Sequence, residues 1–301
     1  MSYGFTGDGT REPGRLALGT VQFGLPYGIA NRGRQTAIDE IGAMLSIAAA
    51  KGIATLDTAI AYGESEKILG EVGVGGWRIV TKLPPVPDSC PDVAGWVERE
   101  IAGSLDRLRV NQLYAVLLHR PEQLLTRHGE TLFSALQALK RSGVTGRIGL
   151  STHGPEELDR LDGFPIDLVQ APMSILDRRM IDSGWARRLK DGGVELHARS
   201  AFLQGLLLMP AADRPAKFDR WRPVWHRWDA WLAERGLTPL EACLGALTPL
   251  EEVDRIVVGA IDSAQLEEIA AASACRLEDL PDWPGPLDPD LISPARWDGL
   301  G

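Results

Sequence analysis

The sequence predicts a closed (β/α)8 barrel, an α/β fold of the TIM-barrel type, formed by residues 1–301 as one domain. Short β-rich runs alternate with longer amphipathic stretches over almost the whole chain, and no linker separates them. Several of the short runs are nearly continuous in apolar residues, as is typical of strands buried on both faces of a parallel sheet. An open doubly wound sheet is the alternative, but no GxGxxG motif follows the first strand candidate.

Eight runs are expected to be strands, and they span residues 16–19, 53–57, 78–82, 113–118, 147–151, 166–170, 194–198 and 255–258. Between them, apolar residues recur at spacings of three and four. Ile38, Ile41, Met44 and Leu45 give one example, and this spacing predicts helices with one buried face. Eight β-then-α units in a chain of this length match the size of one barrel.

Two segments fall outside this alternation. One is 206–236, between the seventh and eighth strands, and the other is the Pro-rich C-terminal tail, about 281–301. Each is a candidate lid over the catalytic end of the barrel or else an inert surface covering. The first contains large apolar residues at spacings of three and four: Phe218, Trp221, Trp225, Trp228 and Leu232. This stripe predicts a buried helix face, with an aromatic wall over the substrate as the alternative.

The composition is that of an ordinary soluble protein, with 44% apolar and 24% charged residues and a net charge of −9. The negative charge argues against nucleic acid or an anionic membrane as a partner, although it leaves room for an anionic cofactor. Three widely spaced cysteines without zinc-ligand spacing indicate a reducing, cytoplasmic setting and no metal site. No apolar run is long enough to span a membrane, residues 1–14 are expected to be flexible, and the oligomeric state is left open.

Four polar residues end predicted strands or follow them closely. Asp57 closes the second strand, Tyr62 lies five residues later, Lys82 closes the third strand, and His119 follows the fourth. Reactive groups of such barrels stand at the carboxyl ends of the strands, and neighbouring strands lie about 4.8 Å apart. The four side chains are therefore expected to converge on one small volume.

The chemistry that suits this set is protonation of a carbonyl oxygen. A tyrosine hydroxyl is a weak acid, so a nearby Lys ammonium that favours the phenolate, itself held by Asp57, makes Tyr62 a better proton donor. His119 can hydrogen-bond and orient the carbonyl group. Each residue alone has a more ordinary explanation, such as capping, packing or a solvated charge. The joint pattern is what predicts function.

These residues lie in motifs that resemble the aldo/keto reductase family. The matching segments are residues 56–63 (LDTAIAYG), 64–70 (ESEKILG), 81–83 (TKL) and 118–121 (LHRP). The resemblance extends from about residue 15 to about residue 272. It implies a barrel, a nicotinamide cofactor bound in extended form, and Tyr62 as the general acid, supported by Lys82, Asp57 and His119.

The resemblance also implies cofactor contacts at four places in the chain. The first strand ends in Gly19 and Thr20, and the fifth and sixth strands supply Ser151, Thr152 and Gln170 for the carboxamide. The loop after the seventh strand supplies Arg199, Ser200, Phe202, Leu203 and Gly205 for the nicotinamide and the phosphates. The segment after the eighth strand, expected to hold the adenosine and to offer backbone N–H groups to a phosphate, supplies Gly259, Ala260, Ile261, Asp262, Ser263, Gln265 and Glu268.

This cofactor shell departs from the family pattern. Thr152 stands where relatives usually have Asn, and Arg199 stands where many have an aromatic residue that stacks on the nicotinamide. A guanidinium there would disfavour the cationic, oxidised ring and so favour the reduced cofactor. Relatives that prefer NADPH commonly have Arg or Lys where this chain has Ile261 and Asp262. The family usually has Asn where this chain has Ile269. Family frequency favours NADP and this local chemistry favours NAD, so the choice stays open.

The expected function is therefore reduction of an aldehyde or ketone, possibly sugar-like, or the reverse oxidation of an alcohol. One alternative is a regulatory subunit that binds the cofactor on the same barrel and senses redox state. Another is a metal-dependent barrel hydrolase that uses Asp57 and His119 as ligands, although a second convincing His is missing from the sequence pattern.

Overall fold

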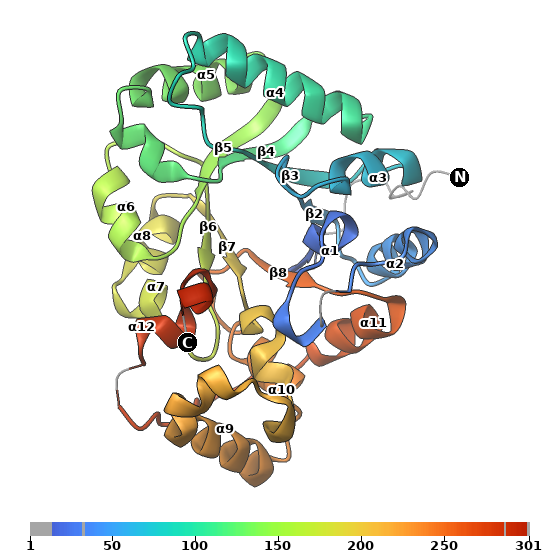
Figure 1. Ribbon diagram of the computed structural model, residues 1–301, viewed down its shortest axis with the longest axis vertical. Coiled ribbons are helices and arrows are strands. Elements are labelled where there is room, and N and C mark those ends of the chain that lie inside the picture. Colours follow the sequence, from blue (N-terminus) through green and yellow to red (C-terminus); the bar gives the residue numbers. More distant parts are fainter. Residues whose placement is uncertain (1–13, 32–33, 286, 300–301) are drawn as a thin grey trace.

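In the computed structural model, residues 14–31, 34–285 and 287–299 are described, and they contain a closed barrel of parallel strands (Figure 1). Each strand pairs with the next along the chain, and the last pairs with the first. The strands are β1 (Leu16–Gly19), β2 (Thr55–Asp57), β3 (Arg78–Leu83), β4 (Leu113–Leu118), β5 (Thr145–Ser151), β6 (Leu168–Pro172), β7 (Glu195–Arg199) and β8 (Arg255–Gly259). The predicted (β/α)8 barrel is confirmed.

Helices surround this barrel (Figure 1). The longer ones are α2 (Ile38–Ala50), α3 (Ser65–Val72), α4 (Val93–Leu108), α5 (Gly129–Arg141), α6 (Pro155–Leu161), α8 (Trp185–Asp191), α9 (Arg222–Arg235), α10 (Pro239–Gly245) and α11 (Ser263–Ala272). Short α-helices are α1 (Val21–Gly24), α7 (Arg179–Asp182) and α12 (Pro289–Ile292). Of the predicted flexible N-terminus, only Gly14 belongs to the described residues.

β1 and β4 have the predicted bounds, and the other six strands differ from them by one or two residues at one or both ends, as β2 and β6 illustrate. β2 begins at Thr55 rather than Ile53, because the N–H of Ile53 still closes the preceding turn onto the Ala48 carbonyl at 2.9 Å. β6 lies two residues further along than expected, and it ends at Pro172, opposite Arg199 of β7. Both shifts leave the polar residues at the carboxyl ends of the strands in place.

The strand register brings these carboxyl ends level with one another. Gly19 of β1 lies beside Asp57 of β2, and Ser151 of β5 lies beside Gln170 of β6. Four residues predicted from distant motifs are thereby placed on one end of the barrel. This follows from parallel pairing, since every strand runs in the same direction and all carboxyl ends meet at one rim.

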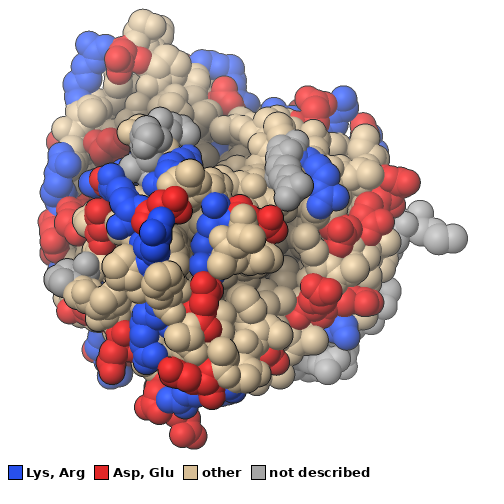
Figure 2. Space-filling view, turned by 60° about the horizontal axis from the view of Figure 1, so that its bottom comes forward, with Lys and Arg blue, Asp and Glu red and all other residues tan. Residues whose placement is uncertain are grey.

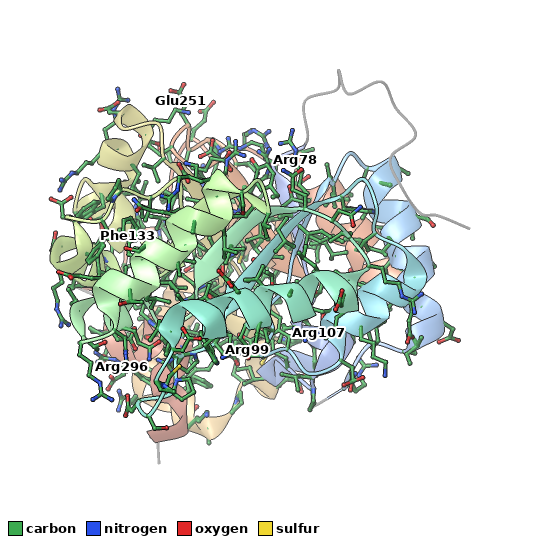
Figure 3. The ribbon with its side chains drawn as sticks, turned by 90° about the horizontal axis from the view of Figure 1, so that it is seen from above. Arg78, Arg99, Arg107, Phe133, Glu251 and Arg296 are labelled. Atoms are coloured by element: carbon green, nitrogen blue, oxygen red, sulfur yellow. The ribbon has the colours of Figure 1, made fainter. Side chains whose placement is uncertain are left out.

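The helix after Tyr62 is fastened to its surroundings by a buried carboxylate. Glu66 of α3 accepts hydrogen bonds from Thr81 of β3 at 2.6 Å and from Ser104 of α4 at 2.7 Å. It also pairs with Arg107 of α4, labelled in Figure 3, at 2.8 Å. A buried charge is tolerated only when it is paired and hydrogen-bonded, and here it ties α3 to both neighbours. This fixes the end of the loop that carries Tyr62.

The Trp-rich stripe forms the buried helix face that its spacing predicts. It runs through a 3₁₀ turn (Ala216–Trp221) into α9, and Phe218 and Trp228 are completely buried. The indole N–H groups of Trp225 and Trp228 donate to main-chain carbonyls, so the buried polar atoms of both rings are satisfied.

The C-terminal tail packs against this same region through a hydrogen bond, an ion pair and a contact between aromatic rings. The indole N–H of Trp221 donates to Asp288 at 3.1 Å, and Arg220 pairs with Asp290 at 3.0 Å. The ring of Trp297 meets Phe218 edge to face, with ring centroids 4.9 Å apart. The tail, red in Figure 1, is thereby held across the ends of β6 and β7.

On the face seen in Figure 2, acidic and basic residues alternate without a large patch of one sign. Within the described part of the chain, no helix combines the length and the apolar character needed to cross a bilayer.

Candidate active site

A cavity of about 510 Å³ opens at the carboxyl ends of the strands. Asp57, Tyr62 and His119 line it, as their sequence positions predict. Lys82 lies just beneath the surface of the cavity and is only 1% exposed. The structure therefore brings the four predicted catalytic residues together, three in the wall and one behind it.

The floor of the site is a buried ion pair. The ammonium group of Lys82 donates to both carboxylate oxygens of Asp57 at 2.8 Å and to the Thr58 carbonyl at 2.9 Å. Burial opposes the charge on this lysine, but Asp57, with a smaller contribution from Tyr62, outweighs it, so the pKa of Lys82 is raised. The amide of Gln170 donates a further bond to Asp57 at 2.7 Å. Lys82 is thus fixed in place as a cation.

Tyr62 lies directly over this pair. The Lys82 nitrogen is 5.2 Å from the centre of the Tyr62 ring. Buried hydroxyl groups hold the loop: the Ser65 hydroxyl donates to the Thr20 carbonyl at 2.9 Å, and the Thr20 hydroxyl donates to the Asp57 carbonyl at 3.0 Å. These hydrogen bonds join the ends of β1 and β2 to the start of α3. Tyr62 lies in the loop before α3, so the same bonds fix its position.

Gly24, at the end of α1, sets the distance between α1 and the Tyr62 loop. A Cβ atom on Gly24 would lie 1.8 Å from the Tyr62 carbonyl oxygen and 2.6 Å from the Ser65 nitrogen. Both are main-chain atoms and cannot turn aside as a flexible side chain could. A glycine is therefore required for this close approach.

His119 faces Tyr62 across the cavity. Their rings meet edge to face, with centroids 6.0 Å apart and an interplanar angle of 81°. Burial first, and the charge of Lys82 second, lower the pKa of His119 to about 4. The imidazole is therefore neutral near pH 7, and one ring nitrogen can donate a hydrogen bond to an oxygen in the cavity.

The predicted cofactor residues divide into two groups. Those that line the cavity are Gly19, Thr20, Ser151, Gln170, Arg199, Ser200, Phe202, Gly205 and Gly259. Those that lie outside the cavity wall are Thr152, Leu203, Ala260, Ile261, Asp262, Ser263, Gln265 and Glu268. The first group surrounds the proposed reaction centre, and most of the second group belongs to the start of α11.

Arg199 reaches across the cavity rim to the end of β5. Its guanidinium group donates to the Thr152 carbonyl at 2.7 Å and to the Ser200 hydroxyl at 3.2 Å. The side chain of Thr152 is completely buried and turned toward the Gln170 carbonyl, 3.5 Å away. Thr152 therefore contributes its main-chain carbonyl to the site, through Arg199, rather than a side-chain contact.

The loop after β7 has an unusual backbone. Ser200, Leu203 and Gln204 have φ angles of 60°, 46° and 53°, and Gly205 follows at 90°. Non-glycine residues rarely adopt this conformation, and such outliers concentrate at ligand-binding sites. The N–H groups of Leu203 and Gly205 donate to the main-chain carbonyls of Ser200 and Phe202, each at 2.9 Å. The phosphate contact that the resemblance implies for this loop stays a prediction.

Gln22 of α1 belongs to the cavity wall. Its side chain is 6% exposed and packs on Gly259, where a Cβ atom would lie 2.4 Å from the amide nitrogen. The amide oxygen is buried and has no hydrogen-bond partner among the residues that the structure describes. A buried acceptor without a partner is costly, so this atom is suited to receive a donor from a bound ligand.

The outer part of the cavity is built from the two segments that lie outside the barrel alternation. The tail contributes Ser293, Pro294, Ala295 and Trp297, and the segment after β7 contributes Leu208 and Lys217. The ammonium group of Lys217 donates to the Trp297 carbonyl at 3.1 Å. By contrast, Phe218, Trp221, Trp225 and Trp228 are absent from the described cavity lining. The tail therefore covers the site, and the Trp-rich helix supports it from behind.

The comparison with protein families matches residues 15–280 to the model of the aldo/keto reductase family. The chain belongs to the aldo/keto reductase family. The matched segment includes β1 to β8 and all four predicted catalytic residues. Members of this family are oxidoreductases that generally use nicotinamide cofactors.

Solved structures of similar fold are also aldo-keto reductases. A putative aldo-keto reductase from Pseudomonas aeruginosa is 25% identical, with a TM-score of 0.65, covering 89% of this chain and 92% of its own. The aldo-keto reductase AKR11C1 from Bacillus halodurans, in its holo form, is 18% identical with a TM-score of 0.68, covering 95% and 92%. A comparison with curated proteins gave no significant match.

The hydrolase alternative requires Asp57 and His119 as metal ligands. Both oxygens of Asp57 already accept hydrogen bonds, from Lys82 and from Gln170. Among the residues that the structure describes, no group of three or more His, Cys, Asp and Glu side chains is placed to hold a metal ion. The arrangement of Asp57 is that of a counter-ion for Lys82.

Proposed function

We propose that the protein is an NAD(P)H-dependent reductase that converts an aldehyde or ketone to an alcohol, or catalyses the reverse reaction, with Tyr62 as the general acid and base. The observation that carries this proposal is the Lys82–Asp57 pair, buried directly beneath the Tyr62 ring at the floor of the cavity. A fixed cation at this position stabilises the negative charge that Tyr62 acquires when it gives up its proton.

When bound in the cavity, a reduced nicotinamide cofactor would supply the hydride for the carbonyl carbon of the substrate. Tyr62 gives its hydroxyl proton to the carbonyl oxygen, so one hydride and one proton yield the alcohol, and the phenolate remains beside Lys82. Neutral His119 donates a hydrogen bond to the same oxygen and orients it toward Tyr62. In the reverse reaction Tyr62 takes the proton of the alcohol.

The residues of the cavity fit the nicotinamide half of such a cofactor. Ser151 and the oxygen of Gln170 would hold the carboxamide, and the free acceptor of Gln22 would meet a donor of the ribose. Arg199 would face the nicotinamide ring, where its positive charge disfavours the oxidised form. We therefore expect the reduced cofactor to bind more tightly than the oxidised one.

The substrate we propose is polar and sugar-like. Tyr27, Asn31, His153 and Lys217 contribute hydrogen-bonding groups to the outer part of the cavity. Trp297 adds an apolar surface to the same region, which suits the ring of a hydroxylated substrate. The three cysteines are free thiols, in keeping with the cytoplasmic setting expected from the sequence.

Tyr62→Phe tests the proposal, with Tyr27→Phe as the matched control, because both tyrosines line the cavity and only Tyr62 is placed over Lys82 among the described contacts. Loss of a general acid lowers the rate by about 10²–10⁴-fold. We expect that loss in kcat for a panel of aldehydes and ketones with Tyr62→Phe, with cofactor affinity unchanged, and less than about threefold loss with Tyr27→Phe. Near-normal turnover of Tyr62→Phe would remove Tyr62 from this role.

The same measurements separate the enzyme from the redox-sensing alternative. A regulatory subunit would bind the cofactor tightly and transfer no hydride to any member of the panel. The ordered Lys82–Asp57–Gln170 arrangement supports the enzyme, because cofactor binding alone does not require a buried cation beneath a tyrosine.

A further inference from the structure

We infer that this reductase selects NADH over NADPH, because the carboxylates of Glu40 and Asp262 occupy the start of α11, where the 2′-phosphate of NADPH would have to be placed. The inference rests on the proposed function and extends it to the identity of the cofactor. The start of the helix after the last strand is a usual phosphate-binding position in barrels of this type. Here the chain fills it with its own anions.

Two of the first three N–H groups of α11 are already hydrogen-bonded to carboxylates of the chain. The Ser263 N–H donates to the Glu40 carboxylate at 2.6 Å, and the Gln265 N–H donates to the Asp262 carboxylate at 2.9 Å. The Ile261 N–H, just before the helix, donates to the Gln265 side chain at 3.2 Å. A phosphate that binds to these N–H groups would have to displace their present acceptors.

Glu40 is held by two helices at once. It belongs to the first turn of α2, and its side chain reaches the first turn of α11, which packs beside α2. Negative charge is favoured near a helix N-terminus, and Glu40 meets this condition at both helices. Hydrogen bonds from Ser263 lower the pKa of Glu40, so the side chain is an anion near pH 7.

The remaining charge at this position is also negative. The sequence of α11 contains Glu267 and Glu268, both exposed, and no Lys or Arg. Within the described residues, no ion pair joins a Lys or Arg to Glu40 or Asp262. A dianionic phosphate at this position would therefore be repelled by these carboxylates.

The same carboxylates suit the adenosine ribose of NADH. A ribose 2′-hydroxyl is a hydrogen-bond donor, and an ionised carboxylate only accepts. Dinucleotide-binding sites of another fold use Asp or Glu for the 2′-hydroxyl of NAD and Arg for the 2′-phosphate of NADP. Glu40 and Asp262 meet the first of these requirements by charge and by donor–acceptor type.

The test measures binding, not turnover. Quenching of tryptophan fluorescence, to which Trp297 in the cavity wall contributes, gives Kd for NADH and NADPH with the full-length chain. Competition by 5′-AMP and by adenosine 2′,5′-bisphosphate isolates the adenosine end. The variants are Glu40→Gln, Asp262→Ser, which keeps a helix-capping side chain while removing the charge, and the double variant. Asp39→Asn is the matched control, since Asp39 is exposed in the same turn of α2.

We expect the wild-type protein to bind NADH at least about tenfold more tightly than NADPH, a difference of about 1.4 kcal/mol. Glu40→Gln and Asp262→Ser should each improve NADPH binding by about threefold or more and weaken NADH binding, because the ribose 2′-hydroxyl loses a carboxylate acceptor. The double variant should shift the NADPH-to-NADH ratio further. Asp39→Asn should change the ratio by less than twofold. The affinity for adenosine 2′,5′-bisphosphate relative to 5′-AMP should change across these variants in the same order as the affinity for NADPH relative to NADH.

Equal or tighter binding of NADPH by the wild-type protein overturns the inference and leaves the proposed function standing. So does an unchanged NADPH-to-NADH ratio in the double variant, provided that circular dichroism and thermal melting show a folded protein. If neither NADH nor NADPH quenches the fluorescence or competes with 5′-AMP, the proposed function is overturned, and this inference falls with it.

Discussion

Replacing Lys82 by Met should destabilise the protein by about 3–5 kcal/mol, because it leaves the Asp57 carboxylate buried without its cation. The lysine is 1% exposed, and the side chain of Asp57 is 6% exposed. Only the amide of Gln170, at 2.7 Å, would still donate to the carboxylate among the side chains described. Methionine fills a similar volume, so the loss reflects the missing charge and hydrogen bonds rather than a cavity.

A double-mutant cycle with Asp57→Asn measures this pairing. The free energies of unfolding are measured in urea for the wild type, Lys82→Met, Asp57→Asn and the double variant. The double variant should lose about 1–3 kcal/mol less than the sum of the two single losses. Lys67→Met is the matched control, since Lys67 pairs with Glu64 at 3.0 Å on the surface, and its unfolding midpoint should barely change.

Activity should behave differently from stability in this cycle. Carbonyl reduction should fall by about 10²-fold or more in both single variants and should not recover in the double variant, because the cation beneath Tyr62 is absent from it. Strictly additive stability losses would refute the claim that Asp57 and Lys82 stabilise each other. Recovery of turnover in the double variant would refute the claim that Lys82 acts as a charge.

Two further predictions follow from the geometry around Tyr62. Gly24→Ala should lower kcat by about 10–100-fold with cofactor affinity little changed, because the added methyl group must push the main chain of Tyr62 and Ser65 away. Gly75→Ala is the control, since a Cβ atom added there would have no neighbouring atom within 4 Å. Equal kcat values for the two variants would contradict the argument. His119, with a pKa lowered from 6.5 to about 4, should leave kcat/KM without an inflection at the ordinary pKa of histidine, as a pH–rate profile can show. The unfolded chain takes up this proton near 6.5 and the folded chain only near 4, so the stability contributed by neutral His119 is present above 6.5 and is lost as the pH falls toward 4. An inflection near 6.5 in the pH–rate profile, or a contribution to stability that does not fall between pH 6.5 and 4, would refute the assignment.

The convergence of Asp57, Tyr62, Lys82 and His119 at one end of the barrel could be predicted from sequence because each position is fixed by a local pattern. Asp57 and Lys82 end apolar runs that can only be buried strands, and parallel pairing then places their side chains at one rim. Tyr62 and His119 follow at short distances from strand ends, so small errors in strand boundaries do not move them away. For this reason the two-residue shift of β6 left the site unchanged.

The directions of individual side chains and their hydrogen-bond partners could not be predicted from the sequence. Thr152 comes directly after Ser151, the last residue of β5, yet its side chain is buried against the Gln170 carbonyl, because successive residues of an extended chain point to opposite sides. Gln22 acquires its free acceptor only because β8 ends in a glycine that leaves room for the amide. Neither feature has a local sequence signal.

The start of α11 shows how far such effects can reach. In the sequence, Glu40 is one of two acidic residues in the first turn of a helix, which is an ordinary local complement to the helix dipole. Closure of the barrel brings β8 back beside β1 and packs α11 against α2, so this residue meets a helix N-terminus 223 positions away in the chain. The motifs that set the proposed reaction are therefore local, whereas the preference for NADH that we infer depends on a contact created by closing the barrel.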